Sequence, residues 1–163
     1  MVDFKTLRDN YVAQWEQLEF QSVFNEFIEK DSFKGYGIYK KASNEFSQNI
    51  EKIVLYIEPV GFTFQERVYV DEYKHTEEIL YLSRFRSTIK VIGKLVPTFV
   101  HESPPTYLNR ILSKNKMTEF HLVLQFNPSD WQLSIGKYTI EYTVTDNISK
   151  KSFEIIKDVK IVS

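Results

Sequence analysis

The pattern of hydrophobic and polar positions changes near residue 30. Before it, residues 3–29 contain neither Gly nor Pro, and their apolar positions recur in steps of three and four. Positions with this spacing lie on one side of a helix. The pattern therefore predicts an amphipathic N-terminal helix within a segment over residues 1–30, straight or bent near 18–21. Its stripe, which packs on the rest of the chain or docks on another chain, consists of Phe4, Leu7, Tyr11, Trp15 and Leu18.

After residue 30 the apolar positions alternate with polar ones, which is the period of a β-strand. The first predicted strand is 33–39, and the longest is 79–92. Turn signals such as Pro59, Gly61 and the acidic stretch 71–78 separate the runs. Many short strands with turns at this spacing predict one mainly β domain over residues 31–163. The other predicted strands are 53–57, 62–70, 120–126, 138–144 and 153–161.

Four different sequence motifs are distributed over most of residues 33–162. They are G-Y-G-I-Y at 35–39, I-V-L-Y-I-E-P-V-G-F at 53–62, G-K-Y-T-I-E-Y-T-V-T-D at 136–146 and S-F-E-I-I-K-D at 152–158. Together they resemble a family of uncharacterised archaeal proteins. A P-G-E turn of that family is replaced here by Asn49-Ile50-Glu51 after Gln48. The resemblance implies an immunoglobulin-like antiparallel β-sandwich, here behind the N-terminal helix, and an exported, envelope-associated location, but no known activity.

Charge and cysteine content exclude several classes of function. The net charge of −1 disfavours a nucleic-acid partner, because such proteins gather a positive excess. The absence of cysteine removes disulfides, thiolate metal sites and cysteine nucleophiles. No apolar run is long enough to span a bilayer. Two compartments stay open: extracytoplasmic if an export signal was removed, and otherwise cytoplasmic.

No group of residues in the sequence indicates an enzyme, a metal site or a cofactor. His75, His101 and His121 are too far apart to form a local metal-binding pair. The paired carboxylates at 71–72 and 77–78 fall in one polar turn, where they keep a hairpin soluble. We therefore expect no catalytic residue, no metal and no cofactor.

Several exposed positions are candidates for contact with a partner. Arg84 and Arg86 share one strand face and either bind an anion or an acidic partner, or guard the sheet against edge pairing. Trp131 either stacks on a ligand or packs as a staple under its loop. Trp15 and Leu18 represent the helix stripe. Asn147 begins an N-x-S glycosylation sequon, which matters only in an exported protein.

These observations favour a non-enzymatic interaction or structural module. We expect its partner to be a protein, either another chain or a second copy, that is bound through the N-terminal helix or the loops. The alternative is a carrier that holds a small apolar ligand among the many Phe and Tyr side chains. A hydrolase is a third hypothesis, and it requires a pocket where His101 or His121 meets a carboxylate.

Overall fold

The computed structural model describes residues 17–94, 100–113 and 120–163, together with positions 3, 6, 10, 13, 14 and 116. The described chain is mainly β, as predicted. Its strands are β1 (Gln21–Ile28), β2 (Glu45–Ser47), β3 (Ile53–Val60), β4 (Gln65–Asp71), β5 (Thr76–Gly93), β6 (Val100–Glu102), β7 (Thr106–Ser113), β8 (Leu122–Phe126), β9 (Gly136–Asp146) and β10 (Ser152–Val162).

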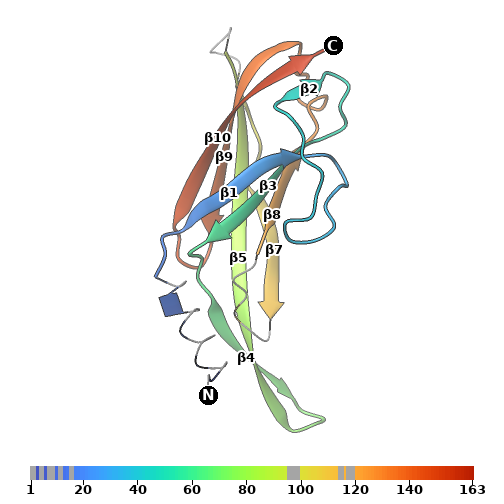
Figure 1. Cartoon of the computed structure of the whole chain (residues 1–163). Coiled ribbons are helices and arrows are strands. Elements are labelled where there is room, and N and C mark those ends of the chain that lie inside the picture. The colour runs from blue at the N-terminus through green and yellow to red at the C-terminus, as the bar shows by residue number, and fades with distance from the viewer. Residues whose placement is uncertain are drawn as a thin grey trace.

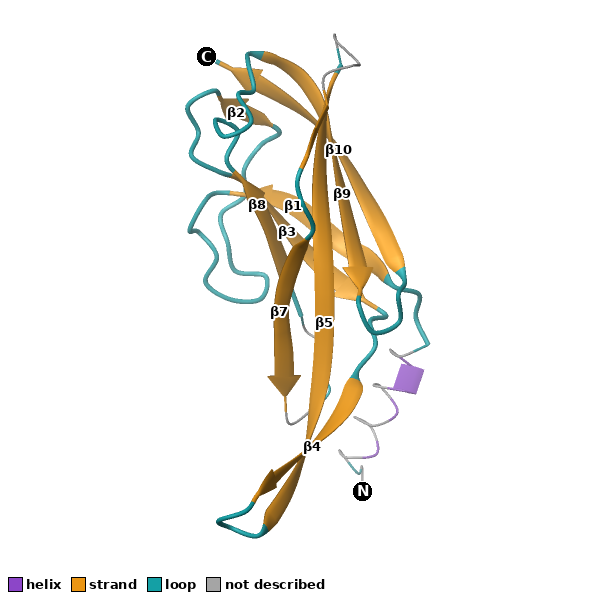
Figure 2. Cartoon of the chain, turned by 180° about the vertical axis from the view of Figure 1, so that it is seen from behind, coloured by secondary structure: helices purple, strands orange, loops and turns teal. Residues whose placement is uncertain are grey.

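The strands form two sheets that face each other (Figures 1 and 2). The small sheet has the order β1-β3-β8, and the large one has the order β2-β10-β9-β5-β4. Strand β5 is the axis of the large sheet: β4 and β9 pair along one edge, and β7 and β6 along the other. The sheets curl like half of a barrel. The result is a sandwich-like arrangement, and strand β5 extends beyond the two packed sheets (Figures 1 and 2).

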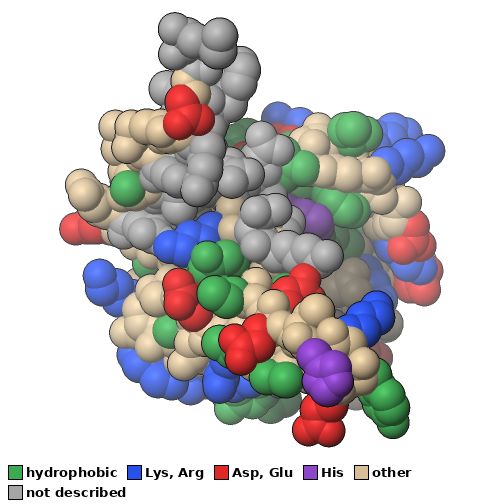
Figure 3. All heavy atoms as spheres, turned by 90° about the horizontal axis from the view of Figure 1, so that it is seen from below, with side chains coloured by type: hydrophobic (Ala, Val, Ile, Leu, Met, Phe, Trp, Pro, Cys, Tyr) green, Lys and Arg blue, Asp and Glu red, His purple; other side chains and the backbone are tan. Residues whose placement is uncertain are grey.

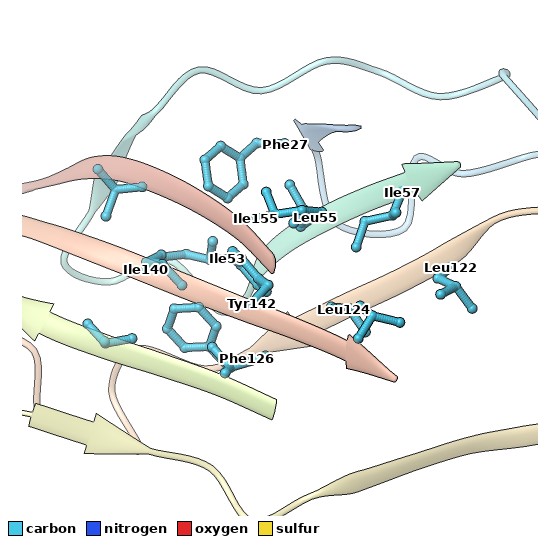
Figure 4. Packing of buried hydrophobic residues seen from close by; sticks show 14 of the residues in the cluster. Phe27, Ile53, Leu55, Ile57, Leu122, Leu124, Phe126, Ile140, Tyr142 and Ile155 are labelled. Atoms are coloured by element: carbon cyan, nitrogen blue, oxygen red, sulfur yellow. The ribbon is translucent and has the colours of Figure 1, made fainter. Parts of the chain in front are cut away.

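The core lies between the sheets and follows the alternation of the strands (Figure 4). Every second side chain of β3, β8, β9 and β10 points into it, because successive side chains of a strand face opposite sides. Leu55 of the small sheet and Ile140 of the large sheet are both fully buried there. This arrangement confirms the alternation that was used to predict these strands.

Strand β3 is buried on its outer face as well. Tyr56, which points away from the inter-sheet core, is fully buried beside Ile28 and Val54. The connection between β1 and β2 covers this face and packs Phe33 and Tyr39 on the Tyr56 ring. The predicted strand at 33–39 is therefore wrong: the segment is a covering loop with a turn at Gly37, whose φ is 72°.

The predicted amphipathic N-terminal helix is also wrong. Residues 21–28, its second part, form β1, and no helix is among the elements of the described chain. A β-bulge between Ser22 and Phe24 explains the misleading spacing. One extra residue shifts the alternation, so Phe20 and Phe27 both enter the inter-sheet core although they are seven residues apart. A helix brings residues seven apart to one side as well.

The sheet pairing requires a further correction. The three-residue strand β2 pairs with β10 in parallel and so departs from the predicted antiparallel, immunoglobulin-like sandwich, whereas the other strand pairs are antiparallel. The small sheet begins with β1 at Gln21, which is ahead of the expected start at residue 31. Over the described residues the architecture is thus a curled, mainly β pair of sheets, with no helix among its elements.

Tyr142 of β9 is the one buried side chain of the described residues whose polar atom has no hydrogen-bond partner. Its ring fills the core, but burial of the hydroxyl without a partner costs free energy, and the pKa of Tyr142 is raised by that burial. We expect Tyr142→Phe to raise the free energy of unfolding by about 1 kcal/mol in denaturant titrations.

Tyr138, four residues earlier on the same strand, provides the matched control. Its hydroxyl donates to the carbonyl oxygen of Ser134 at 2.8 Å. Tyr138→Phe should therefore lower the free energy of unfolding by about 1 kcal/mol. Equal losses in both variants would contradict the assignment of Tyr142 as an unsatisfied hydroxyl.

Candidate functional site

An open groove with a volume of about 350 Å³ lies where the β9–β10 turn meets β5 and β7. Three of its lining side chains are cations, and none is acidic. Its position beside the start of β4 places it at the base of the projecting β4–β5 hairpin. We call it the basic groove, and its lining residues are Gln65, Arg84, Arg86, Tyr107, Asn147, Ile148 and Lys150.

Two of the cations come from one face of β5. Arg84 and Arg86 are two residues apart on a continuous strand, so their side chains leave the sheet on the same side. The intervening Phe85 is buried on the core side, which fixes this orientation. Arg86 pairs across the sheet with Tyr107 of β7, whose side chain is 68% exposed. The groove thus combines two guanidinium groups with an accessible aromatic ring.

The β9–β10 turn supplies the third cation and is fixed to β5. The amide of Asn147 donates to the carbonyl oxygen of Arg84 at 2.9 Å. Inside the turn the amide of Lys150 donates to the carbonyl oxygen of Asp146 at 2.8 Å, and Lys150 adopts a φ of 67°. The side chain of Asp146 accepts from the amides of Ile148 and Ser149. These contacts hold Lys150 next to the two arginines.

The cations of the basic groove have no acidic partner among the described residues. Arg84, Arg86 and Lys150 take part in no ion pair there, whereas other lysines do. Lys94, for example, lies 2.9 Å from Asp158. Arginine presents a planar fork of donors that suits carboxylates and phosphates. The groove is therefore suited to an anionic group that the chain itself does not place there.

The other predicted contact residues lie apart from one another. Trp131 stacks on Phe126, with 4.7 Å between ring centroids, and on His101, so it packs as the staple of its loop. Leu18 is 44% exposed just before β1. Trp15 lies outside the described residues. Asn147, the predicted glycosylation position, lines the basic groove.

Sequence reasoning identified Arg84 and Arg86 but missed Tyr107 and Lys150. Tyr107 lay in a segment with no clear pattern, and Lys150 follows an ordinary turn. Their contribution depends on which strands flank β5, and this pairing links residues far apart in the chain. A run of polar and basic residues directly after a strand was the one available signal for Lys150.

The three histidines do not meet, and no metal-binding group of three or more His, Cys, Asp or Glu side chains is found among the described residues. His75 lies in the exposed β4–β5 turn, and His101 stacks on Trp131. His121 stacks on Phe33 with 4.2 Å between ring centroids. Burial lowers the pKa of His121 although the charge of Glu58 acts in the opposite direction, and the Glu58 carboxylate accepts the hydroxyl of Tyr56 at 2.9 Å. The geometry therefore gives the hydrolase hypothesis no support.

A second cluster of chemically distinctive side chains covers the small sheet, and its role is structural. We call it the outer aromatic cluster: Phe33, Tyr39, Tyr56 and His121. Burial, with the Glu58 hydrogen bond, raises the pKa of Tyr56 to about 12. The Tyr56 oxygen accepts the amide of Gly37 at 3.0 Å. A phenol with this pKa stays protonated, and here it fastens the covering loop to the sheet.

His121 gives this cluster a pH dependence. Burial lowers the pKa of His121 below its usual 6.5, so the unfolded chain binds a proton more readily than the folded one. The free energy of unfolding is therefore highest above the pKa of the unfolded chain, 6.5, and it decreases as the pH falls through this value. We expect the melting temperature to fall as the pH is lowered from 7.5 to 5.5, roughly the range over which His titrates.

The variant His121→Phe keeps an aromatic ring on Phe33 but does not titrate. Its melting temperature should change less over the same pH range than that of the unmodified chain. His75→Phe, at an exposed turn, is the matched control and should leave the slope unchanged. An identical slope in His121→Phe and the unmodified chain would show that His121 is not the titrating group.

Comparison of the chain with protein-family models, curated proteins and solved structures finds no match. Among the residues that the structure describes, no helical segment has the length and apolarity that a membrane crossing requires. The case for a function therefore depends on the geometry of this chain alone.

Proposed function

We propose that this protein is a non-enzymatic interaction module that binds an acidic segment of a protein partner in the basic groove. The observation that carries the proposal is the set of three cations, Arg84, Arg86 and Lys150, around one opening, where no described residue forms an ion pair with them. Rows of carboxylates on a partner would complete the charge pairs.

A protein partner fits the groove better than a nucleic acid does. The net charge of the chain is −1, so three cations at one site do not produce the broad positive surface that a phosphate backbone needs. Tyr107 and Ile148 add apolar surface beside the cations. Aromatic residues and arginine are the side chains that contribute most at protein interfaces.

The apolar-carrier hypothesis has less support. The aromatic side chains that could enclose an apolar ligand pack on each other between the sheets. The rings of Phe62 and Phe85 lie 5.3 Å apart, and the rings of Phe85 and Phe120 lie 5.5 Å apart. The described groove is instead open and lined mainly by polar side chains.

The proposal predicts that a polyglutamate peptide binds the full chain at low ionic strength. Isothermal titration at 0.01 M salt, where the screening length is about 30 Å, gives the strongest signal. Arg84→Ala with Arg86→Ala should raise the dissociation constant at least about tenfold, which corresponds to roughly 1.4 kcal/mol. The reason is that two of the three cations are removed from the groove.

A charge-matched control separates local binding from the effect of net charge. Lys137→Ala with Lys160→Ala removes two exposed cations that pair across β9 and β10, at the end of β9 opposite the groove. We expect this variant to bind polyglutamate nearly as well as the unmodified chain. Equal weakening in both double variants would overturn the proposal, because binding would then follow net charge rather than the groove.

A further inference from the structure

The β4–β5 hairpin projects from the body of the molecule as a ribbon of two strands (Figures 1 and 2). Residues 65–71 pair with 76–82, and β7 joins the other edge of β5 only from Tyr81 onward. We call the ribbon over residues 65–80 the arm. A two-stranded ribbon is marginally stable in water by itself, so an arm of this length indicates a contact with something else.

The surface of the arm is both apolar and acidic. Val68, Val70 and Ile79 are 61%, 62% and 51% exposed, and Val68 and Ile79 are cross-strand partners on one face. Tyr73 in the turn is 98% exposed. The view from this end shows acidic and hydrophobic side chains next to one another (Figure 3). Exposed apolar patches with polar rims are typical of interaction sites.

The charge of the arm is opposite to that of the basic groove. Residues 65–80 contain five acidic and two basic side chains, a formal charge of −3, while the whole chain carries −1. The rest of the chain is therefore positive by +2. Glu72 and Glu77, near the arm's turn, are exposed. One chain thus carries both members of a complementary pair of surfaces.

The arm is not able to fill the groove of its own chain. Gln65, the first residue of β4, lines the groove, and the strand runs away from it. At about 3.3 Å per residue, the turn near Tyr73 lies on the order of 25 Å from the arm's base. Any arm seated in a groove must come from a different molecule.

We propose that the partner of the basic groove is the arm of a second copy of this chain. The proposal rests on the proposed function, because it names the source of the acidic segment. Glu72 and Glu77 of one copy face Arg84, Arg86 and Lys150 of the next, and Tyr73 packs beside the exposed Tyr107. Each copy then offers one arm and one free groove, so the contact is head-to-tail and produces an open chain or a closed ring.

Sedimentation velocity on the full chain tests this assembly. At 0.01 M salt the average mass should rise with protein concentration, and it should fall when salt shortens the screening length from about 30 Å to about 8 Å. Glu72→Gln with Glu77→Gln, the arm variant, and Arg84→Gln with Arg86→Gln, the groove variant, should each remain monomeric, and neutral side chains are used so that the two altered surfaces do not attract each other on mixing. Lys137→Gln with Lys160→Gln is the matched control, and it should assemble like the unmodified chain.

Mixing the two monomeric variants gives the sharpest result. The arm variant keeps an intact groove, and the groove variant keeps an intact arm, so an equimolar mixture should form a one-to-one dimer that grows no further. This dimer also demonstrates that both variants are folded. If circular dichroism shows that either variant is unfolded, the substitutions Glu72→Ala with Glu77→Ala or Arg84→Ala with Arg86→Ala replace it.

The outcomes separate this inference from the proposed function. If the unmodified chain stays monomeric at every concentration while polyglutamate still binds, self-assembly is overturned and the acidic partner is a different protein. If folded variants form no dimer on mixing, self-assembly through arm and groove is overturned as well. If polyglutamate binding also fails, the proposed function itself is overturned. A one-to-one dimer confined to the mixture supports both.

Discussion

Replacing Gly61 by alanine is expected to lower the free energy of unfolding by roughly 2–5 kcal/mol, which is a large share of a small domain's stability. Gly61 follows β3 with a φ of 74°, a region that side chains rarely adopt. A methyl group there would also overlap the backbone carbonyl groups of Glu19 and Leu18, with the Leu18 oxygen only 2.6 Å away. Neither strand β3 nor the segment before β1 is able to move without disturbing the small sheet.

Gly37→Ala separates the two contributions to this loss. Gly37 has nearly the same φ, 72°, but a methyl group at this position would meet nothing within 4 Å. Its substitution should therefore cost only the backbone term, roughly 1–2 kcal/mol. Urea titration of both variants gives the comparison. Equal losses would contradict the close approach of Gly61 to the chain before β1.

Asp146→Ala should have the second large effect, a loss of roughly 3–5 kcal/mol, because it leaves buried amides without an acceptor. Asp146 is fully buried at the end of β9. Its Oδ2 accepts the amide of Thr63 at 2.7 Å, and its Oδ1 accepts the amide of Ile148 at 2.9 Å. One side chain therefore joins the β9–β10 turn to the connection between β3 and β4.

Two further variants sharpen this test in the same denaturant titration. Asp146→Asn keeps one oxygen for Ile148 but presents an amide group to the Thr63 N–H, so its loss should be smaller yet clear. Asp130→Ala removes an exposed carboxyl from a different turn and should change the free energy of unfolding by less than about 0.5 kcal/mol. A small effect of Asp146→Ala, similar to that of Asp130→Ala, would show that the turn does not depend on this carboxyl.

The strands that sequence reasoning predicted well are those whose alternation is regular. Strand β9 alternates between buried apolar or aromatic positions and half-exposed polar ones, such as Tyr138 and Ile140 on one side and Thr139 on the other, and the structure confirms this alternation. The prediction of secondary structure failed where a local irregularity gave the apolar residues the spacing of a different element. The bulge in β1 produced a helical spacing, and the covering loop at 33–39 carries aromatic residues because it packs on Tyr56 rather than because it is a strand.

The candidate site could be predicted only in part, for a similar reason. The two arginines of β5 are two residues apart, so their common face is visible in the sequence. Tyr107 and Lys150 reach the same groove through strand pairing and a turn that the local sequence does not determine. The core side of β5 was also predicted only partly: Phe85 and Ile89 are buried, but Ile79 lies on the arm and is 51% exposed.

Amide chemical-shift mapping of the ¹⁵N-labelled chain during titration with polyglutamate is the most direct test of the basic groove. The account predicts shift changes concentrated at Arg84, Arg86, Tyr107 and the 147–150 turn, with little change in β1, β3 and β8. Changes centred on the small sheet, or spread evenly over all exposed lysines, would contradict the assignment of the groove as the binding site.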